Sequence, residues 1–194
     1  MGPLLFVLFI NDIVENLECQ CYLYADDMKL YRIINDAENA VSLQKNLERV
    51  VDWTEKWLLK LNIAKCKVLR VNDKNISSDK MYTISEKGTD TSLEKVGSER
   101  DLGVIIDNQL SFGTHIEDII NKSNKIVGVI KRNFRDLDKK TFVTLYKAMV
   151  RSRLYAQAVW SPHKLKYVDA LEAVQRRATK ILPSLRKYIV MLTD

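Results

Sequence analysis

Residues 19–32 read CQCYLYADDMKLYR, and two short apolar and aromatic runs in this stretch flank Ala25-Asp26-Asp27. The runs have the residue types of strands and the residues between them those of a turn, so the stretch predicts a β-hairpin. Two adjacent carboxylates at a tight turn repel each other unless a cation offsets their charge. Either Asp26 and Asp27 are ordinary turn residues, or they hold a divalent cation such as Mg²⁺ or Mn²⁺, which prefer carboxylate oxygens.

The opening of the chain is apolar but predicts neither a membrane span nor a cleavable signal. MGPLLFVLFINDI (1–13) has no basic residue before its apolar run, and Asn11 and Asp12 interrupt that run after about ten residues, too few to cross a bilayer. The pattern favours a buried amphipathic helix over residues 3–17. With 194 residues, 46% of them hydrophobic, the chain is expected to bury a core as soluble globular proteins do, without a membrane partner.

Cys19, Cys21 and Cys66 are the cysteines of the sequence. A zinc site requires about four cysteine, histidine or acidic ligands at characteristic spacings, and these residues lack both the number and the spacing. We therefore expect reduced, half-buried thiols in an intracellular protein. No segment of the sequence separates the nucleus from the cytoplasm as its location.

The pattern of apolar residues predicts an α+β arrangement in the first part of the chain. Residues 36–60 place apolar side chains at spacings of three and four, as in a long helix. Polar, turn-forming stretches separate further segments that are rich in strand-forming residues. These segments are 65–71, 80–84 and 101–107.

From His115 onward the pattern is helical, and the remaining turn signals divide this part into about three helices. Breaks are expected near residues 135–139, near residues 161–164 and at Pro183. The sequence thus predicts a mixed domain over residues 1–112 and an all-helical domain over residues 113–194.

Charge is unevenly distributed along the sequence. Residues 1–120 carry 14 Lys and Arg against 20 Asp and Glu, a net charge of −6. Residues 121–194 carry 17 against 5, a net charge of +12. So basic a region is expected to attract a polyanion such as a nucleic-acid backbone. The simpler interpretation is a solvated charged surface.

The segment YADD (24–27), between its hydrophobic arms, resembles motif C of reverse transcriptases. The wider sequence resembles the RNA-directed DNA polymerases of non-LTR retrotransposons, of the jockey and LINE type. Five more segments carry this resemblance, in the family's order. They are GPLLFVLFINDI (2–13) for the end of motif B, WTEKWLLKLNIAKCKVL (53–69) for motif D, ERDLGVIIDNQLSFGTHI (99–116) for the strand leading into the thumb, and LYKAMVRSRLYAQAVWSP (145–162) and LEAVQRRATKIL (171–182) for the helices beyond.

The resemblance implies a fold and a chemistry. Residues 1–112 would form part of a polymerase palm, and residues 113–194 a basic thumb-like or connection-like region. In the family, two divalent ions, Mg²⁺ or Mn²⁺, drive nucleotidyl transfer from a dNTP to a DNA primer on an RNA template. Asp26 would be a direct metal ligand, and Asp27 a neighbouring carboxylate with a weaker or indirect role.

Other residues receive roles from the same resemblance. Tyr24 would lie close to the primer terminus. Lys65 falls where motif D places a lysine thought to assist the departing pyrophosphate, although an exposed lysine before a strand is an equally good interpretation. Nucleic acid is expected to contact basic residues of the helical region, namely Lys131, Arg132, Arg135, Arg151 and Arg153.

Three large side chains are expected to be structural. Trp53 and Trp57 lie four residues apart on the predicted helix, so we expect them in the core rather than as platforms for stacked bases. His115 has no second candidate metal ligand beside it, which favours a structural or helix-capping role.

The sequence also departs from the family pattern. The family's catalytic centre includes a further aspartate, in motif A, on a strand that precedes motif B, and no residue here matches it. We therefore expect a fragment of a reverse transcriptase, with an incomplete metal site and no activity as an isolated chain. A palm without its partner strand is also expected to expose a sheet edge that invites association. The alternative function is a non-catalytic remnant that binds nucleic acid through its basic helices.

Overall fold

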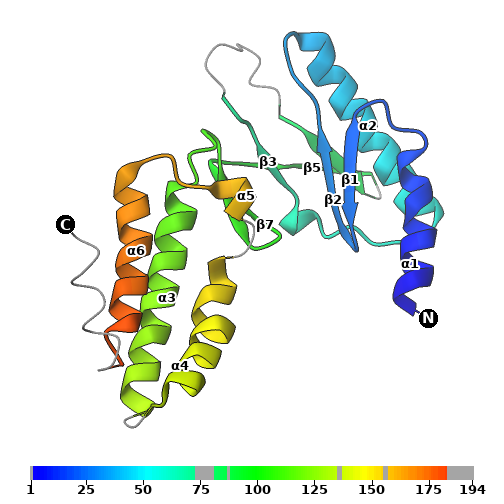
Figure 1. Ribbon diagram of the computed structural model, residues 1–194. Coiled ribbons are helices and arrows are strands. Elements are labelled where there is room, and N and C mark those ends of the chain that lie inside the picture. Colours follow the sequence, from blue (N-terminus) through cyan, green and yellow to red (C-terminus); the bar gives the residue numbers. More distant parts are fainter. Residues whose placement is uncertain (1, 73–80, 87, 135–136, 155–156, 183–194) are drawn as a thin grey trace. The chain divides into compact units, whose positions relative to one another are not determined.

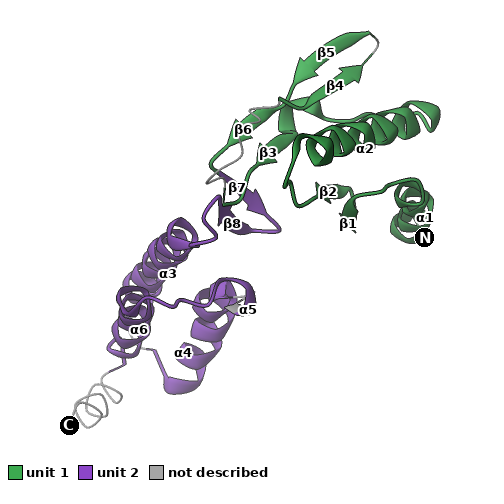
Figure 2. Cartoon of the chain, turned by 90° about the horizontal axis from the view of Figure 1, so that it is seen from above, with its two compact units in different colours: residues 1–97 green, residues 98–194 purple. Residues whose placement is uncertain are grey.

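The computed structural model describes residues 2–72, 81–86, 88–134, 137–154 and 157–182 (Figure 1). The chain forms two compact units, residues 1–97 and 98–194 (Figure 2). Both units combine helices with small two-stranded sheets, so the α+β class is confirmed. The assignment of these parts as palm and thumb stays a prediction. No helix in the described ranges is long and apolar enough to span a membrane.

The first unit begins with two short helical segments and a β-hairpin, followed by a long helix and several short strands. Its elements are α1 (Gly2–Ile10), the 3₁₀ segment η1 (Asn11–Val14), β1 (Gln20–Tyr24), β2 (Asp27–Tyr31), α2 (Ala37–Lys56), the 3₁₀ segment η2 (Ile63–Lys65), β3 (Lys67–Leu69), β4 (Thr83–Glu86), β5 (Thr89–Ser92) and β6 (Glu94–Val96). β1 pairs with β2 and β4 with β5 in antiparallel fashion, whereas β3 and β6 are parallel.

Helix α2 organises the core of the first unit, because two neighbouring residues of the helix belong to different apolar clusters. Val50 packs with Ile10 and Ile13, and the half-buried side of the β1–β2 hairpin closes this cluster. Val51 packs with Tyr82 and other residues of the β4–β5 region. The hairpin is therefore held against a rigid helix through its apolar face.

Two predicted helices are shorter than the sequence pattern indicated. The helix expected over residues 3–17 is α-helical only to Ile10 and continues as the 3₁₀ segment η1. The expectation that it is buried is wrong, because within α1 only Ile10 is buried and its leucines are exposed. The helix expected to reach residue 60 ends at Lys56, because Leu58 adopts a positive φ of 57°. A left-handed residue at this position terminates a helix.

The second unit places a hairpin before a group of helices. Its elements are β7 (Ser98–Asp101), β8 (Val104–Asp107), α3 (Gly113–Asn133), α4 (Lys139–Leu145), the π-helical segment η3 (Tyr146–Val150), the 3₁₀ segment η4 (Arg151–Leu154), α5 (Gln157–Trp160) and α6 (Leu165–Thr179). Helices α3, α4 and α6 pack around a common apolar cluster that includes Ile130, Phe142 and Val174 (Figure 1).

The hairpin β7–β8 differs from the single strand-like segment expected over residues 101–107. Leu102 and Gly103 adopt positive φ values of 44° and 87°, which turn the chain back on itself. Val104 then packs against Ile116 of α3. Because of this packing the compact unit begins at Ser98, upstream of the boundary expected at residue 112.

Candidate functional site

The turn between β1 and β2 consists of Ala25 and Asp26, because Tyr24 and Asp27 form the last cross-strand pair. Asp27 is therefore the first residue of β2 and not part of a three-residue turn as the sequence suggested. Ala25 has a φ of 53°, a left-handed conformation that costs a residue with a Cβ about 1 kcal/mol. The fold thus holds the tip of the hairpin in a strained turn, with Asp26 in the turn and Asp27 directly after it.

The exposed face of the hairpin is aromatic. The register places Tyr24 beside Asp27, and both residues are exposed. On the same face the rings of Tyr22 and Tyr31 stack with centroids 5.4 Å apart and planes 4° from parallel. Their hydroxyl oxygens lie 3.2 Å apart, and the hydrogen bond with Tyr22 raises the pKa of Tyr31. An acidic tip therefore adjoins a flat aromatic surface.

Asp26 and Asp27 are exposed, and neither carboxylate forms an ion pair or a side-chain hydrogen bond with a described residue. Across the ranges that the structure describes, no three histidine, cysteine or acidic side chains gather into a metal-binding group. Mg²⁺ takes one or two protein carboxylates and completes its coordination with water and substrate phosphates, and the role of Asp26 and Asp27 in holding such an ion stays a prediction.

Lys65 is exposed at the end of η2, immediately before β3. Its backbone N–H donates to the carbonyl oxygen of Asn62 at 2.9 Å, which closes the 3₁₀ turn. Among the contacts of the described residues, none joins Lys65 to the carboxylates at the hairpin tip. Its role in the departure of pyrophosphate stays a prediction.

The two tryptophans pack against the first helix. The ring of Phe9 lies 5.6 Å from that of Trp53 and 5.4 Å from that of Trp57. Trp53 is half-buried, and Trp57 keeps 43% of its surface exposed. Both side chains contact α1 from the end of α2. The expected core position is confirmed for Trp53, which packs against the cluster of Ile10, Ile13 and Val50, but is wrong for Trp57, which is exposed.

The cysteines and His115 agree with their predicted structural roles. Cys19, Cys21 and Cys66 are free and half-buried, and burial raises the pKa of each thiol. His115 is buried, and its Nδ1 atom accepts a hydrogen bond from the backbone N–H of Ile105 at 3.2 Å. Its ring meets that of Trp160 edge-on at 5.4 Å.

The basic residues expected to contact nucleic acid fall in the second unit. Lys131 and Arg132 lie in the last turn of α3, and Arg151 and Arg153 lie in η4; all four are exposed. Arg135 lies outside the described residues. The sequence identified these residues by charge and resemblance, and the structure divides them between two segments of the unit.

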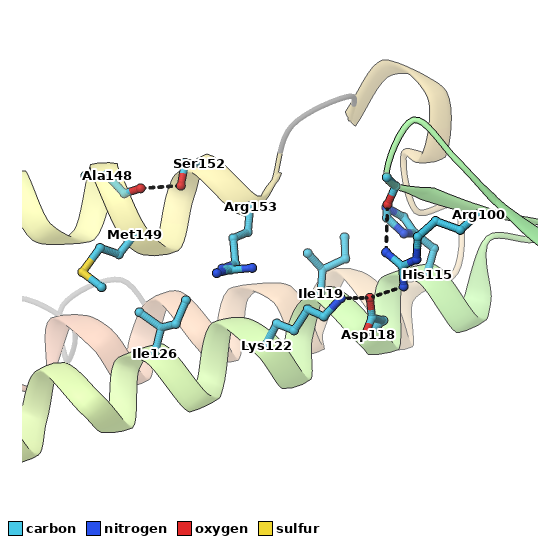
Figure 3. Close-up of a pocket in the computed structure, with 11 residues that line it drawn as sticks. Arg100, His115, Asp118, Ile119, Lys122, Ile126, Ala148, Met149, Ser152 and Arg153 are labelled. Carbon is cyan, nitrogen blue, oxygen red and sulfur yellow. Dashed lines mark hydrogen bonds and ion pairs between the residues drawn. The ribbon is translucent and has the colours of Figure 1, made fainter. Parts of the chain in front are cut away.

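A cavity of about 500 Å³ opens beside Arg153 in the second unit (Figure 3). We call it the basic cavity, because its charged lining includes Arg100, Lys122 and Arg153. The Asp118 carboxylate at its edge accepts from Lys122 at 2.7 Å and from Arg100 at 3.2 Å. The hydrogen bond from Lys122, reinforced by Arg100, lowers the pKa of Asp118 although partial burial opposes this.

Sequence patterns did not reveal most of the basic cavity. Asp118 and Lys122 are four residues apart on a helix, and this spacing was a usable signal of a pair. Arg100 comes from the preceding hairpin, eighteen residues before Asp118. No local pattern predicts that contact, because it depends on how β7–β8 packs on α3.

Comparison with known proteins gives a family and two relatives. The family model described as reverse transcriptase (RNA-dependent DNA polymerase) matches residues 1–106. The chain is 25% identical over 189 residues to the retrovirus-related Pol polyprotein from type-1 retrotransposable element R1 of Nasonia vitripennis, covering 91% of this chain and 56% of the relative. It is 21% identical over 201 residues to the probable RNA-directed DNA polymerase from transposon X-element of Drosophila melanogaster, covering 97% of this chain and 21% of the relative.

The chain thus spans about half the length of the first relative and about a fifth of the second. No solved structure is significantly similar to it.

Proposed function

The chain belongs to the reverse transcriptase family, of the type found in non-LTR retrotransposons, and from this we propose that it is part of a polymerase domain that copies RNA into DNA. The observation that carries the proposal is the β1–β2 hairpin, whose strained turn holds Asp26 at its tip and Asp27 at the start of β2. Family membership favours this function over that of a module that only binds nucleic acid.

The proposed reaction is nucleotidyl transfer. The 3′-hydroxyl oxygen of a DNA primer attacks the α-phosphorus of a dNTP that is paired with the RNA template. A new P–O bond forms, the bond to the β-phosphate breaks, and pyrophosphate leaves while the hydroxyl proton passes to solvent. Bound Mg²⁺ or Mn²⁺ would make the hydroxyl more acidic and offset the negative charge of the triphosphate.

The hairpin residues have distinct roles in this proposal. Asp26 would hold a divalent ion directly, because its carboxylate is exposed and forms no ion pair with any described basic residue. Asp27 would support it from the first position of β2. Tyr24 is the cross-strand partner of Asp27 and is 65% exposed, so its ring is accessible beside the carboxylates. In this proposal the ring would lie against the primer terminus. Lys65 would donate a proton or a positive charge to the departing pyrophosphate.

Metal binding at the hairpin can be tested without measuring activity. We expect Mn²⁺ added to ¹⁵N-labelled chain to broaden the amide signals of residues 24–28 before others. Asp26→Asn should abolish this selective broadening, because it removes the charged oxygen ligand. Asp90→Asn changes an exposed carboxylate on β5 and serves as the control. Equal broadening in the native chain and in Asp26→Asn would contradict the proposed ligand.

Polymerase activity is tested by primer extension on a primed RNA template with Mg²⁺ or Mn²⁺. The family's centre uses a motif A aspartate that this sequence does not match, so we expect no incorporation by the isolated chain. Incorporation that disappears with Asp26→Ala would contradict that expectation but would support the role of Asp26. Incorporation unaffected by Asp26→Ala would contradict the proposed site itself.

A further inference from the structure

The basic cavity lies in the second unit, and the polymerase chemistry proposed for the hairpin does not use it. Three cationic side chains of its lining, Arg100, Lys122 and Arg153, face a single carboxylate, that of Asp118. His115 also borders the cavity, where burial lowers its pKa and so favours its neutral form. The lining therefore carries two more positive charges than negative ones.

We propose that the basic cavity binds a phosphate group, held by Arg153 together with Arg100 and Lys122. The chemistry is that of an anion with several oxygen acceptors, which guanidinium and ammonium groups bind through charge-assisted hydrogen bonds. The phosphate belongs to the backbone of the nucleic acid on which the polymerase acts. The choice of a nucleic acid as the source of the phosphate rests on the proposed polymerase function.

Arg153 is the member of the cavity whose charge is not compensated. It forms no ion pair with any described residue, whereas Arg100 and Lys122 share Asp118. Figure 3 shows its side chain extending from η4 toward α3, into the space that Lys122 borders from the helix. Like charges that face one cavity repel each other, and an anion between them removes that cost.

The other two cations are held in place before any ligand arrives. The Asp118 carboxylate accepts from both at 2.7 and 3.2 Å, so their donors are already ordered. Binding to ordered groups loses less conformational entropy than binding to free side chains. The uncharged lining includes Ile119, Ile126 and Met149, an apolar surface on which a sugar ring can rest.

The size and the charge of the surroundings favour a nucleic acid as the source of the phosphate. A volume of about 500 Å³ exceeds what one inorganic phosphate fills and lies in the range of small-ligand sites. Residues 98–194 carry 18 Lys and Arg against 10 Asp and Glu. This surplus of positive charge suits a nucleic-acid backbone, because a protein that binds one neutralises several of its phosphates.

The test is equilibrium binding of the full chain to a fluorescein-labelled RNA–DNA hybrid, measured by anisotropy in EDTA at several KCl concentrations. Arg153→Gln should weaken binding about tenfold at low salt. It should also reduce the slope of log affinity against log salt by about one, because one phosphate contact is lost. Lys140→Gln removes the same charge from an exposed position of α4 outside the cavity, and should change affinity less than about twofold.

Arg153→Lys separates a charge contact from a packing role. We expect it to keep the salt slope of the native chain and to recover part of the affinity, since lysine supplies the charge without the two parallel donors of arginine. A packing role would instead leave Arg153→Lys as weak as Arg153→Gln. That result would overturn the proposal.

A second arm distinguishes the source of the phosphate, with dTTP as the probe. Suppose that Arg153→Gln loses dTTP binding but binds the hybrid as well as Lys140→Gln does. The cavity would then bind the phosphate of a free nucleotide, and the nucleic-acid backbone would be overturned as its source. If Arg153→Gln matches Lys140→Gln in both arms, the cavity binds no phosphate and the proposal fails. Measurement in EDTA requires neither metal nor incorporation, so this failure is distinguishable from a failure at Asp26.

Discussion

Asn46 links two segments of the first unit from inside the core. It is fully buried in α2, and its Oδ1 atom accepts from the backbone N–H of Glu18 at 2.7 Å. Its Nδ2 atom donates to the carbonyl oxygen of Ser42, also at 2.7 Å. The side chain therefore satisfies a backbone donor in the loop that leads into β1, and so fixes the entry of the hairpin.

Replacing Asn46 should destabilise the first unit. Asn46→Ala removes the acceptor of the Glu18 backbone N–H and leaves a small void in the core. We therefore expect a loss of about 2 kcal/mol in the free energy of unfolding. Urea denaturation followed by far-UV circular dichroism measures this loss. Lys45→Ala, at the exposed neighbouring position, should change stability by less than about 0.5 kcal/mol. Equal effects of the two substitutions would contradict the role assigned to Asn46.

His115 makes the stability of the second unit depend on pH. Burial lowers its pKa, and its Nδ1 atom must stay unprotonated to accept from Ile105. The unfolded chain, with a histidine pKa of about 6.5, therefore binds a proton before the folded one does. Stability is fully present above that unfolded value and falls as pH decreases from there through the lower folded pKa.

The measurement is a series of urea denaturations between pH 7.5 and pH 5. His115→Asn keeps an acceptor near the Nδ1 position but does not titrate in this range, so its stability should depend less on pH than that of the native chain. An identical pH dependence in both proteins would assign the effect to other groups.

At the scale of single elements, the β1–β2 turn is the most constrained feature. Ala25 at a φ of 53° tolerates only residues that accept the left-handed region. We expect Ala25→Gly to be neutral or slightly stabilising, since released strain offsets the greater freedom of the unfolded chain. Ala25→Val should destabilise the hairpin by about 1–2 kcal/mol, because a β-branched residue resists positive φ.

Hydrogen exchange of the backbone amides in β1 and β2 measures this change in hairpin stability. We expect these amides to be protected in Ala25→Gly at least as well as in the native chain, and less well in Ala25→Val. A valine variant as protected as the native chain would show that the turn has relaxed to another conformation.

Local patterns predicted the elements whose contacts are local. The periodicity of residues 36–60 identified α2, and the paired runs around Asp26 identified the hairpin, because neighbouring residues determine both. The parallel pairing of β3 with β6 was missed, since it joins Lys67 to Glu94 across the intervening β4–β5 hairpin. The segment of β5, TDTS, is polar and fully exposed, so it carries no apolar signal of a strand.

The same distinction holds for the candidate site. Asp26, Asp27 and Tyr24 adjoin one another in the chain, so a short stretch of sequence with its resemblance to a known motif was enough to identify them. Asn46 is a polar residue within an apolar helix stripe, a signal that a count of apolar positions overlooks. Arg100 joins the basic cavity only through tertiary packing, which no short window of sequence contains.

At the scale of the whole molecule, the acidic and basic portions are less separate than the sequence suggested. Residues 1–97 carry 13 Lys and Arg against 15 Asp and Glu, and residues 98–194 carry 18 against 10. The contrast is smaller because residues 98–120 are acidic yet belong to the second unit. Two of these acids serve the fold: Asp107 accepts from the backbone N–H groups of Gln109, Ser111 and Phe112, and Asp118 pairs at the basic cavity.

The first unit exposes an apolar surface on α1. Leu4, Leu5 and Leu8 are each at least 60% exposed, and such contiguous surface promotes association. We expect the isolated chain to bind the dye ANS and to form concentration-dependent oligomers in analytical ultracentrifugation. The double substitution Leu4→Gln and Leu8→Gln should reduce both signals.

Ile33→Gln is the matched control, because Ile33 is 76% exposed but lies outside α1. Unchanged oligomers in the α1 double variant would shift the explanation to the open edges of the β1–β2 sheet, which pairs with no other described strand. That outcome would match the association expected from an exposed sheet edge.

The π-helical segment η3 sets the rotational phase of everything that follows it in the same helical run. A π turn takes in one residue more than an α turn, so Tyr146–Val150 acts as a one-residue insertion between α4 and η4. Loss of a single codon there would let the run continue as α-helix with the phase of η4 unchanged, because the π turn accommodates one extra residue, whereas loss of two codons would turn η4 by about 100° about the axis. Arg153 would then leave the basic cavity, although no cavity residue had been replaced. A related protein that lost phosphate binding in this way would still align with Arg100, Lys122 and Arg153. Only the shorter segment before η4 would show the difference.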